Sequence, residues 1–319
     1  MELLLQRGYK NRMRIYAIMV FICCSIRVQA QFEPMFTQYM FNETFINPAY
    51  VGSHENPAAT LLYRNQWVGI NGAPVTQTFT FHAPVADRRL GLGISAMNEN
   101  IGVTHQLTAK VNAAYRLLFP NSALSFGLQG EFTNQEIKYT ELNTITPGDN
   151  QFLSDQERHF RPNAGFGMYY YNDKFYAGIS VPRVLENILD PSGKEHDSRT
   201  NKGFQYWHYY FATGVVLELN EDLKMKPSLM MKAVQNAPVE MDIDANFMIK
   251  DFLWLGCGFR TGDALSAMIG FQLTKQMRFG YSYDFTVSKL QRYNSGSHEF
   301  TLSYEFRTDK NKVISTRYF

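Results

Sequence analysis

The sequence is poor in charge, in cysteine and in long apolar runs. Only 19% of its 319 residues are charged, and 31 Lys and Arg nearly balance 29 Asp and Glu. A soluble protein is nearer a quarter charged, and a nucleic-acid-binding surface needs a basic excess that this chain lacks. Beyond the first thirty residues, no apolar run approaches the length of about 20 residues that a membrane helix needs. These shortages argue against a nucleic-acid-binding protein and a helical membrane protein, while 15% aromatic residues exclude disorder, collagen and a coiled coil.

The first thirty residues have the features of a secretory signal peptide. Three basic residues precede an apolar run at residues 15–26, and small residues end it before Gln31. A run of about 12 residues is too short to cross a bilayer of about 30 Å as a helix. We therefore expect residues 1–30 to be cleaved as a signal peptide, which leaves Cys257 as the only cysteine and the mature chain without an internal disulfide.

The rest of the chain alternates with period two. Odd positions in residues 239–249 are apolar, whereas even positions carry Glu240, Asp242 and Asp244. Such alternation over about ten residues predicts strands with one apolar and one polar face, long enough to cross a membrane when tilted. Soluble strands peak at about five or six residues. Aromatic residues also gather near the ends of the apolar faces, as in residues 207–211, where an interface girdle would place them. These features favour a transmembrane barrel over a soluble β-sandwich.

Fourteen strands are predicted, and bacterial single-chain barrels have even strand numbers. Connections after even-numbered strands are short, and several after odd-numbered strands are long, as expected for periplasmic turns and extracellular loops. The predicted fold class is therefore all-β, a transmembrane antiparallel up-and-down β-barrel with both termini periplasmic. The barrel is placed at residues 59–306, after an N-terminal periplasmic or plug segment at residues 31–58 and before a C-terminal extension at residues 307–319. The predicted strands lie at residues 59–67, 76–84, 90–98, 105–117, 122–133, 163–171, 174–182, 205–218, 224–234, 239–249, 252–260, 264–273, 277–286 and 297–306.

Four stretches together resemble one known family. Residues 36–85 read FTQYMFNETFINPAYVGSHENPAATLLYRNQWVGINGAPVTQTFTFHAPV, residues 91–102 read GLGISAMNENIG, residues 166–186 read FGMYYYNDKFYAGISVPRVLE, and residues 281–306 read YSYDFTVSKLQRYNSGSHEFTLSYEF. They resemble the PorP/SprF family of the type IX secretion system of Bacteroidetes over nearly the whole mature chain. The chain departs from the family pattern in two places. Val51 stands where the family motif NPAYAG has its second Ala, and the C-terminal extension continues past the usual end at the last strand.

The resemblance implies a protein of the outer membrane of a Gram-negative bacterium, embedded in lipid, that takes part in type IX protein secretion. It implies two kinds of partner: a secreted cargo protein, such as a large surface adhesin used in gliding motility or its C-terminal domain, and periplasmic components of the system. No nucleic-acid partner is expected. The alternative from a different class is a passive outer-membrane transporter or channel for small solutes.

The predicted lumen is narrow. A barrel of fourteen strands lies between those filled by side chains, at about 8, and open porins at about 16 to 18. It is too narrow for a folded protein, so we expect docking of cargo rather than its conduction, with residues 31–57 as the candidate plug. Charged residues of both signs are predicted to face the lumen, where they would form a closed network or hold a plug. They are Lys110, Arg116, Glu131, Lys232, Asp242, Asp244, Arg260, Arg278, Asp284 and Glu305.

No catalytic, cofactor-binding or metal site is predicted, so we expect neither an enzyme nor a cofactor. A loose GxGxxA pattern at residues 91–96 lies inside a strand, with no helix after it. The acidic run at residues 242–246 lacks the Gly and Glu of a calcium loop, and the seven His residues show no metal-ligand spacing. The pairs His298 with Ser303 and His82 with Ser95 resemble hydrolase pairs only in residue type.

Two loops are the remaining candidates for contact with partners. Residues 134–162 form a predicted polar loop with interspersed aromatic residues, and long loops on rigid scaffolds often carry function. Residues 184–189 have apolar side chains at helical spacing, which fits either a short amphipathic helix or a packed turn.

Overall fold

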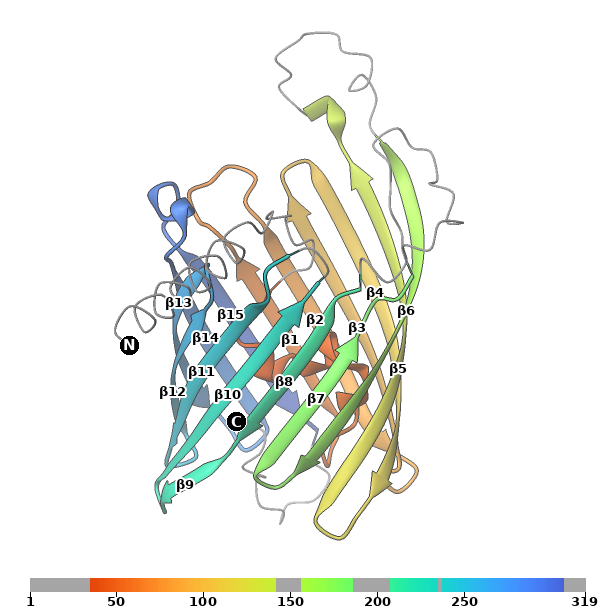
Figure 1. The fold of residues 1–319 in the computed structure, drawn as a ribbon, viewed down its shortest axis with the longest axis vertical. Coiled ribbons are helices and arrows are strands. Elements are labelled where there is room, and N and C mark those ends of the chain that lie inside the picture. Colours follow the sequence, from red (N-terminus) through yellow and green to blue (C-terminus); the bar gives the residue numbers. More distant parts are fainter. Residues whose placement is uncertain (1–34, 142–155, 186–206, 235–236, 307–319) are drawn as a thin grey trace, which may run out of the picture.

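The protein is a closed antiparallel β-barrel (Figure 1). The computed structural model describes residues 35–141, 156–185, 207–234 and 237–306. Within these ranges, fifteen strands form one sheet, and pairing of the first strand with the last closes it. Strands β8 and β9 both pair with β10 and lie end to end, so the wall has fourteen strands. The predicted fold class is confirmed, whereas the predicted signal peptide and C-terminal extension lie outside the described residues.

The elements follow the chain in the order of their pairing. The strands are β1 (Ala58–Asn65), β2 (Val75–Val85), β3 (Leu90–Ile101), β4 (Thr104–Leu118), β5 (Ser122–Ile137), β6 (Gln156–Asn172), β7 (Phe175–Val181), β8 (Tyr209–Val215), β9 (Leu217–Asn220), β10 (Leu223–Ala233), β11 (Glu240–Ile249), β12 (Leu253–Arg260), β13 (Ala264–Gln272), β14 (Met277–Thr286) and β15 (Ser297–Glu305). The helical turns are η1 (Tyr39–Phe41), α2 (Glu43–Ile46), η2 (Pro48–Tyr50), η3 (Tyr139–Glu141) and η6 (Lys289–Arg292). No helix in the described part of the chain is long and apolar enough to span a membrane.

The two faces of the wall reverse the arrangement of a soluble protein. On β5, Phe126 and Leu128 are exposed on the outer face, with Leu128 69% exposed, whereas Gln129 and Glu131 are buried on the inner face. The same alternation of exposed apolar and buried polar residues recurs around the barrel. Lipid on the outside explains the exposed apolar face, because a transmembrane barrel carries an apolar band where it meets lipid. In lipid, every backbone polar group must also be paired within the protein, which the closed sheet achieves.

The two ends of the barrel differ in their connections. One end, the turn end, carries only tight turns of two to four residues, of which residues 86–88 and 250–251 adopt left-handed backbone angles suited to hairpins. The other end, the loop end, carries the long described connections at residues 66–74 and 287–296, and the strand ends that residues 138–155 and 182–208 join also lie there. β1 begins and β15 finishes at the turn end, as the predicted topology requires.

Most predicted strands lie within a few residues of the observed ones, but two predictions were wrong. β5 runs to Ile137 and β6 begins at Gln156, so both ends of the predicted loop at residues 134–162 belong to these two paired strands (Figure 1), while residues 142–155 lie outside the described part. On β5, residues 134–136 are polar on both faces, so the alternation that marks a lipid-facing strand stops there. The predicted strand at 205–218 is divided at Val216, which is buried and donates its N–H to Lys174 O.

Residues 35–57, the plug segment, lie inside the barrel (red to orange in Figure 1). Every residue from 36 to 53 is buried except Phe41, which is partly buried. The segment starts near Arg64 and Glu299 at the loop end, and it reaches the turn end beside Glu305 before entering β1. It therefore passes through most of the length of the lumen.

We predict that a cation on the outer face of β5 destabilises the barrel according to its depth. Leu128→Arg is expected to lower the free energy of unfolding by about 2–4 kcal/mol, because the guanidinium would lie in the apolar band. Asn134→Arg, on the same face nearer the loop end, should change it by no more than about 1 kcal/mol. Denaturant titration in lipid measures both, and equal effects at the two positions would contradict a lipid-facing outer wall.

Candidate functional site

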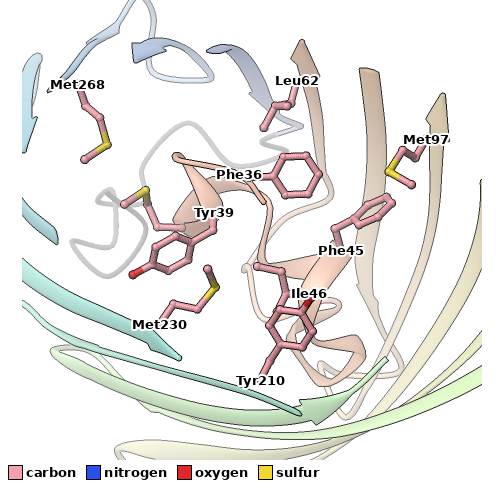
Figure 2. Close-up of a cluster of buried hydrophobic side chains, with 10 residues drawn as sticks. Phe36, Tyr39, Phe45, Ile46, Leu62, Met97, Tyr210, Met230 and Met268 are labelled. Atoms are coloured by element: carbon pink, nitrogen blue, oxygen red, sulfur yellow. The ribbon is translucent and has the colours of Figure 1, made fainter. Parts of the chain in front are cut away.

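The lumen is the candidate functional site, since it brings chemistry-bearing residues from most of the chain together. The plug segment presents Phe36, Tyr39, Phe45 and Ile46 toward the middle of the barrel, where they form one buried cluster (Figure 2). The wall contributes five further members of this cluster, which Figure 2 shows around the plug side chains: Leu62, Met97, Tyr210, Met230 and Met268. Methionine side chains fill irregular gaps well, so the cluster packs the plug against otherwise polar strands.

Charged residues of both signs hold the first residues of the plug segment. Arg64 of β1 lies 2.7 Å from Asp284 of β14 and 3.0 Å from Glu299 of β15, and all three side chains are at most 2% exposed. Glu299 accepts the backbone N–H groups of Thr37 and Gln38 at 2.9 and 2.7 Å. Buried charges are stable only when paired and hydrogen-bonded, and here the plug supplies part of that pairing.

Two further charged groups contact the plug. Arg260 pairs with Asp242 at 2.8 Å and donates to Phe36 O. On the opposite wall, Lys110 pairs with Glu131 at 3.3 Å, donates to Phe45 O, and lies 4.0 Å from the centre of the Phe45 ring. Each cation therefore joins a wall carboxylate to a carbonyl oxygen of the plug.

The plug segment contains one buried carboxyl group of its own. Glu43 in α2 is buried, which raises its pKa to about 7 because burial disfavours the charged form, while Lys226 of β10 acts in the opposite direction. This carboxyl interacts electrostatically with a cluster of buried tyrosines that includes Tyr169 and Tyr176. The sequence pattern did not single out Glu43, because its burial depends on contacts far away in the chain.

Glycines in the wall let the plug backbone approach closely. A Cβ at Gly127 would overlap Ala49, and a Cβ at Gly91 would overlap Val51. Side chains at Gly167 and Gly280 would overlap the plug side chains Asn47 and Gln38 in the same way. These contacts explain why glycines occupy residues 91 and 93 within a strand. The loose dinucleotide-binding pattern in the sequence did not explain them. The strand position of Gly91 was the only signal in the sequence for such an approach.

The plug fills most of the space beside it. One hollow, lined by residues such as Phe45, Met97 and Arg183, has room for about one water molecule. A second hollow near the turn end, lined by residues such as Tyr50 and Arg278, has room for a few. Neither is wide enough to serve as a channel for a solute.

The ten charged residues predicted to face the lumen all lie on the inner face of their strands. The imagined hydrolase pairs are not formed: His298 bonds Tyr281 on the outer face, whereas Ser303 bonds Thr60 on the inner face. His82 and Ser95 both face the lumen, and His82 accepts the N–H of Gly52. Among the described residues, no three His, Cys, Asp or Glu side chains gather as a metal site requires. Residues 186–189 of the possible amphipathic helix lie outside the described part.

The fold and its filled lumen define a class of protein, the plugged β-barrels of outer-membrane type. Sequence comparison then gives the family: residues 28–304 match the family described as type IX secretion system membrane protein PorP/SprF. The chain belongs to this family, and the resemblance seen in the sequence is confirmed. The protein is therefore an outer-membrane component of the type IX secretion system. No curated protein matches the chain.

Solved structures with a similar fold are distant in sequence. The outer membrane protein Omp33 of Acinetobacter baumannii is 8% identical, with a TM-score of 0.47 over 79% of this chain and 98% of that one. A Pseudomonas aeruginosa FadL homologue is 12% identical, with a TM-score of 0.45 over 84% and 94% of the two chains. The KdgM porin is 11% identical, with a TM-score of 0.38 over 78% and 99%.

We predict that a side chain at Gly127 displaces the plug. In Gly127→Val the added carbons overlap the backbone of Ala49, a clash that costs about 1–3 kcal/mol. Amide hydrogen exchange within residues 36–53 should then become roughly tenfold faster or more, since each 1.4 kcal/mol is about a factor of ten.

The matched control is Gly130→Val on the same strand. Its new side chain meets Val111, which is 54% exposed on the outer face, so it should leave plug exchange unchanged. Equal exchange rates in the two variants would contradict the close approach of plug and wall.

Proposed function

We propose that the protein acts in type IX secretion as a sealed docking platform, which binds a secreted cargo protein and does not conduct it. The cargo is a surface protein such as a gliding adhesin or its C-terminal domain, and periplasmic components of the system bind the opposite side. No step of this role involves catalysis or a cofactor. Family membership supports the place in secretion, and the filled lumen supports docking.

The observation that carries the proposal is the plug segment. It is anchored to opposite walls, with Gln38 bonded to Glu299 on β15 and Asn47 donating to Met168 O on β6. A polypeptide in transit would have to displace both anchors and the buried cluster around Phe45. Docking on the outer surface requires neither change.

The loop end offers an ordered surface for a cargo protein. Val68 and residues 295–296 exchange backbone hydrogen bonds, and Gly102 donates to Gly72 O, so the connections after β1, β3 and β14 support one another. Tyr293 on this surface is 72% exposed, and Ile101 is 43% exposed. Exposed aromatic and aliphatic side chains on a rigid support are typical of protein interaction sites.

The turn end suits the periplasmic partners. Its tight turns are charged, with ion pairs such as Lys224 with Asp251 at 2.7 Å and Arg88 with Glu55 of the plug segment at 3.2 Å. Such short polar turns present a fixed surface to a protein in the periplasm.

We predict that the intact protein gives no large, steady conductance in a planar lipid bilayer. The two hollows beside the plug in the described part of the chain hold one to a few water molecules, whereas an open porin of about 16 strands, measured alongside, encloses an aqueous channel. A large, steady current from the unmodified protein would overturn the sealed lumen.

Deletion of the gene tests the role in secretion. The expected result is loss of one secreted surface protein from the cell surface, with growth on individual nutrients unchanged and full recovery on re-expression. A growth defect on one solute with normal secretion would instead identify the passive transporter. Purification from outer membranes should recover the same surface protein or periplasmic secretion components.

A further inference from the structure

The barrel has one seam that no hairpin connects. All other neighbouring wall strands follow one another in the chain, but β1 and β15 are its first and last strands. Their pairing joins residues 58–65 to residues 298–305 through backbone hydrogen bonds, the Arg64–Glu299 ion pair and the Thr60–Ser303 hydroxyl contact, with no turn between the two strands. A flexible loop of such length holds its ends together weakly, so the seam depends on local contacts more than any connected pair does.

The plug segment lies across this seam on the lumen side. The hydroxyl of Thr37 accepts from Arg64 of β1 at 2.9 Å and donates to Asp284 of β14. The backbone N–H groups of Thr37 and Gln38 both donate to the Glu299 carboxylate of β15. Two consecutive plug residues therefore contact both sides of the seam and the strand beyond it.

A second contact holds the seam at the turn end. Asn56, just before β1, donates to Glu305 at 2.9 Å, and Phe306 donates its N–H to Pro57 O. The plug also contacts wall strands away from the seam, as Asn42 with Thr78, Ser180 with Ile46 O and Lys110 with Phe45 O. Those strands are already joined to their neighbours by turns.

Loss of the Thr37 and Gln38 donors, with the rest of the plug in place, would leave an unbalanced charge group at the seam. Asp284 and Glu299 are at most 2% exposed, and Arg64 would have to compensate both without the donors that Thr37 and Gln38 provide. Arg260 is farther from Asp284, at 3.9 Å. A buried carboxylate that loses its donors is strongly destabilising, and here the charged groups lie on the two seam strands and on the adjoining β14.

We propose that the plug segment is a clamp for the β1–β15 seam, so that displacement of the plug opens the barrel there first. The plug then controls the integrity of the wall as well as the filling of the lumen. A partner that pulled on residues 35–57 would act on this strand pair from inside the barrel.

The test uses changes confined to the plug. In the double variant Thr37→Val, Gln38→Pro, the Thr37 hydroxyl, the Gln38 N–H and the Gln38 side-chain amide that donates to Glu299 O are lost, while every wall residue stays the same. The temperature at which the folded band disappears on gels should fall by about 10 °C, the shift expected for a broken buried charge group.

Two matched cysteine pairs then locate the weakness. Thr60 and Ser303 face each other across the seam with hydroxyl oxygens 3.1 Å apart, and Thr108 and Thr133 do so across β4 and β5 at 3.0 Å. Both pairs suit a disulfide between neighbouring strands. With Cys257→Ser throughout, oxidised Thr60→Cys, Ser303→Cys should restore the lost temperature, and oxidised Thr108→Cys, Thr133→Cys should not.

Equal rescue by both disulfides, rescue by neither, or an unchanged temperature in the plug variant would each overturn the clamp. Where the double variant fails to assemble, the single variant Thr37→Val is measured with both cysteine pairs reduced. If the plug clamps the seam, a thiol reagent should react faster with the cysteines at residues 60 and 303 in the Thr37→Val variant than in the same protein with Thr37 unchanged. Its reaction with the cysteines at residues 108 and 133 should be equally fast in both. Equal acceleration at the two pairs, or none at either, would overturn it.

Discussion

Backbone pairing in lipid is the constraint on which the rest of this structure depends. Each N–H and C=O of the wall must find a partner without water, and pairing of β1 with β15 meets that requirement for the two strands that would otherwise be edges. Closure in turn encloses a lumen that water and lipid enter poorly. The polar inner face then needs partners of its own, which the plug segment supplies at Arg64, Asp284 and Glu299.

The width of the barrel explains why a separate segment does this. Side chains fill barrels of about 8 strands, but fourteen strands leave a gap between opposite walls. A narrow peptide with short helical turns crosses that gap, and glycines such as Gly91 and Gly127 admit its backbone where the wall would otherwise obstruct it. Apolar plug residues such as Phe45 contribute packing, while backbone amides contribute charge compensation. The filled lumen is therefore packed and has its charges paired, as in the interior of a soluble protein.

The wall was predictable from the sequence, and the contacts inside it were not. Lipid on one side and polar contacts on the other impose period two, so the alternation alone assigns residues such as Asp242 and Asp284 to the lumen, where both are buried. The alternation stops on β5 after Thr133, because residues 134–136 are polar on both faces, and this is why the sequence predicts that a loop begins there. Glu43, Thr37 and Asn47 gave no local signal, because decisive partners such as Glu299 for Thr37 and Met168 for Asn47 lie 262 and 121 residues away in the chain. The plug could be proposed as a segment but not placed residue by residue.

The anchoring of the plug to opposite walls has a mechanical consequence. Here Gln38 is bonded to β15 and Asn47 to β6, so the plug connects opposite walls and opposes flattening of the barrel under sideways load. A load on the loops would spread over several strands in shear, and the cylinder would keep its cross-section while it bears tension.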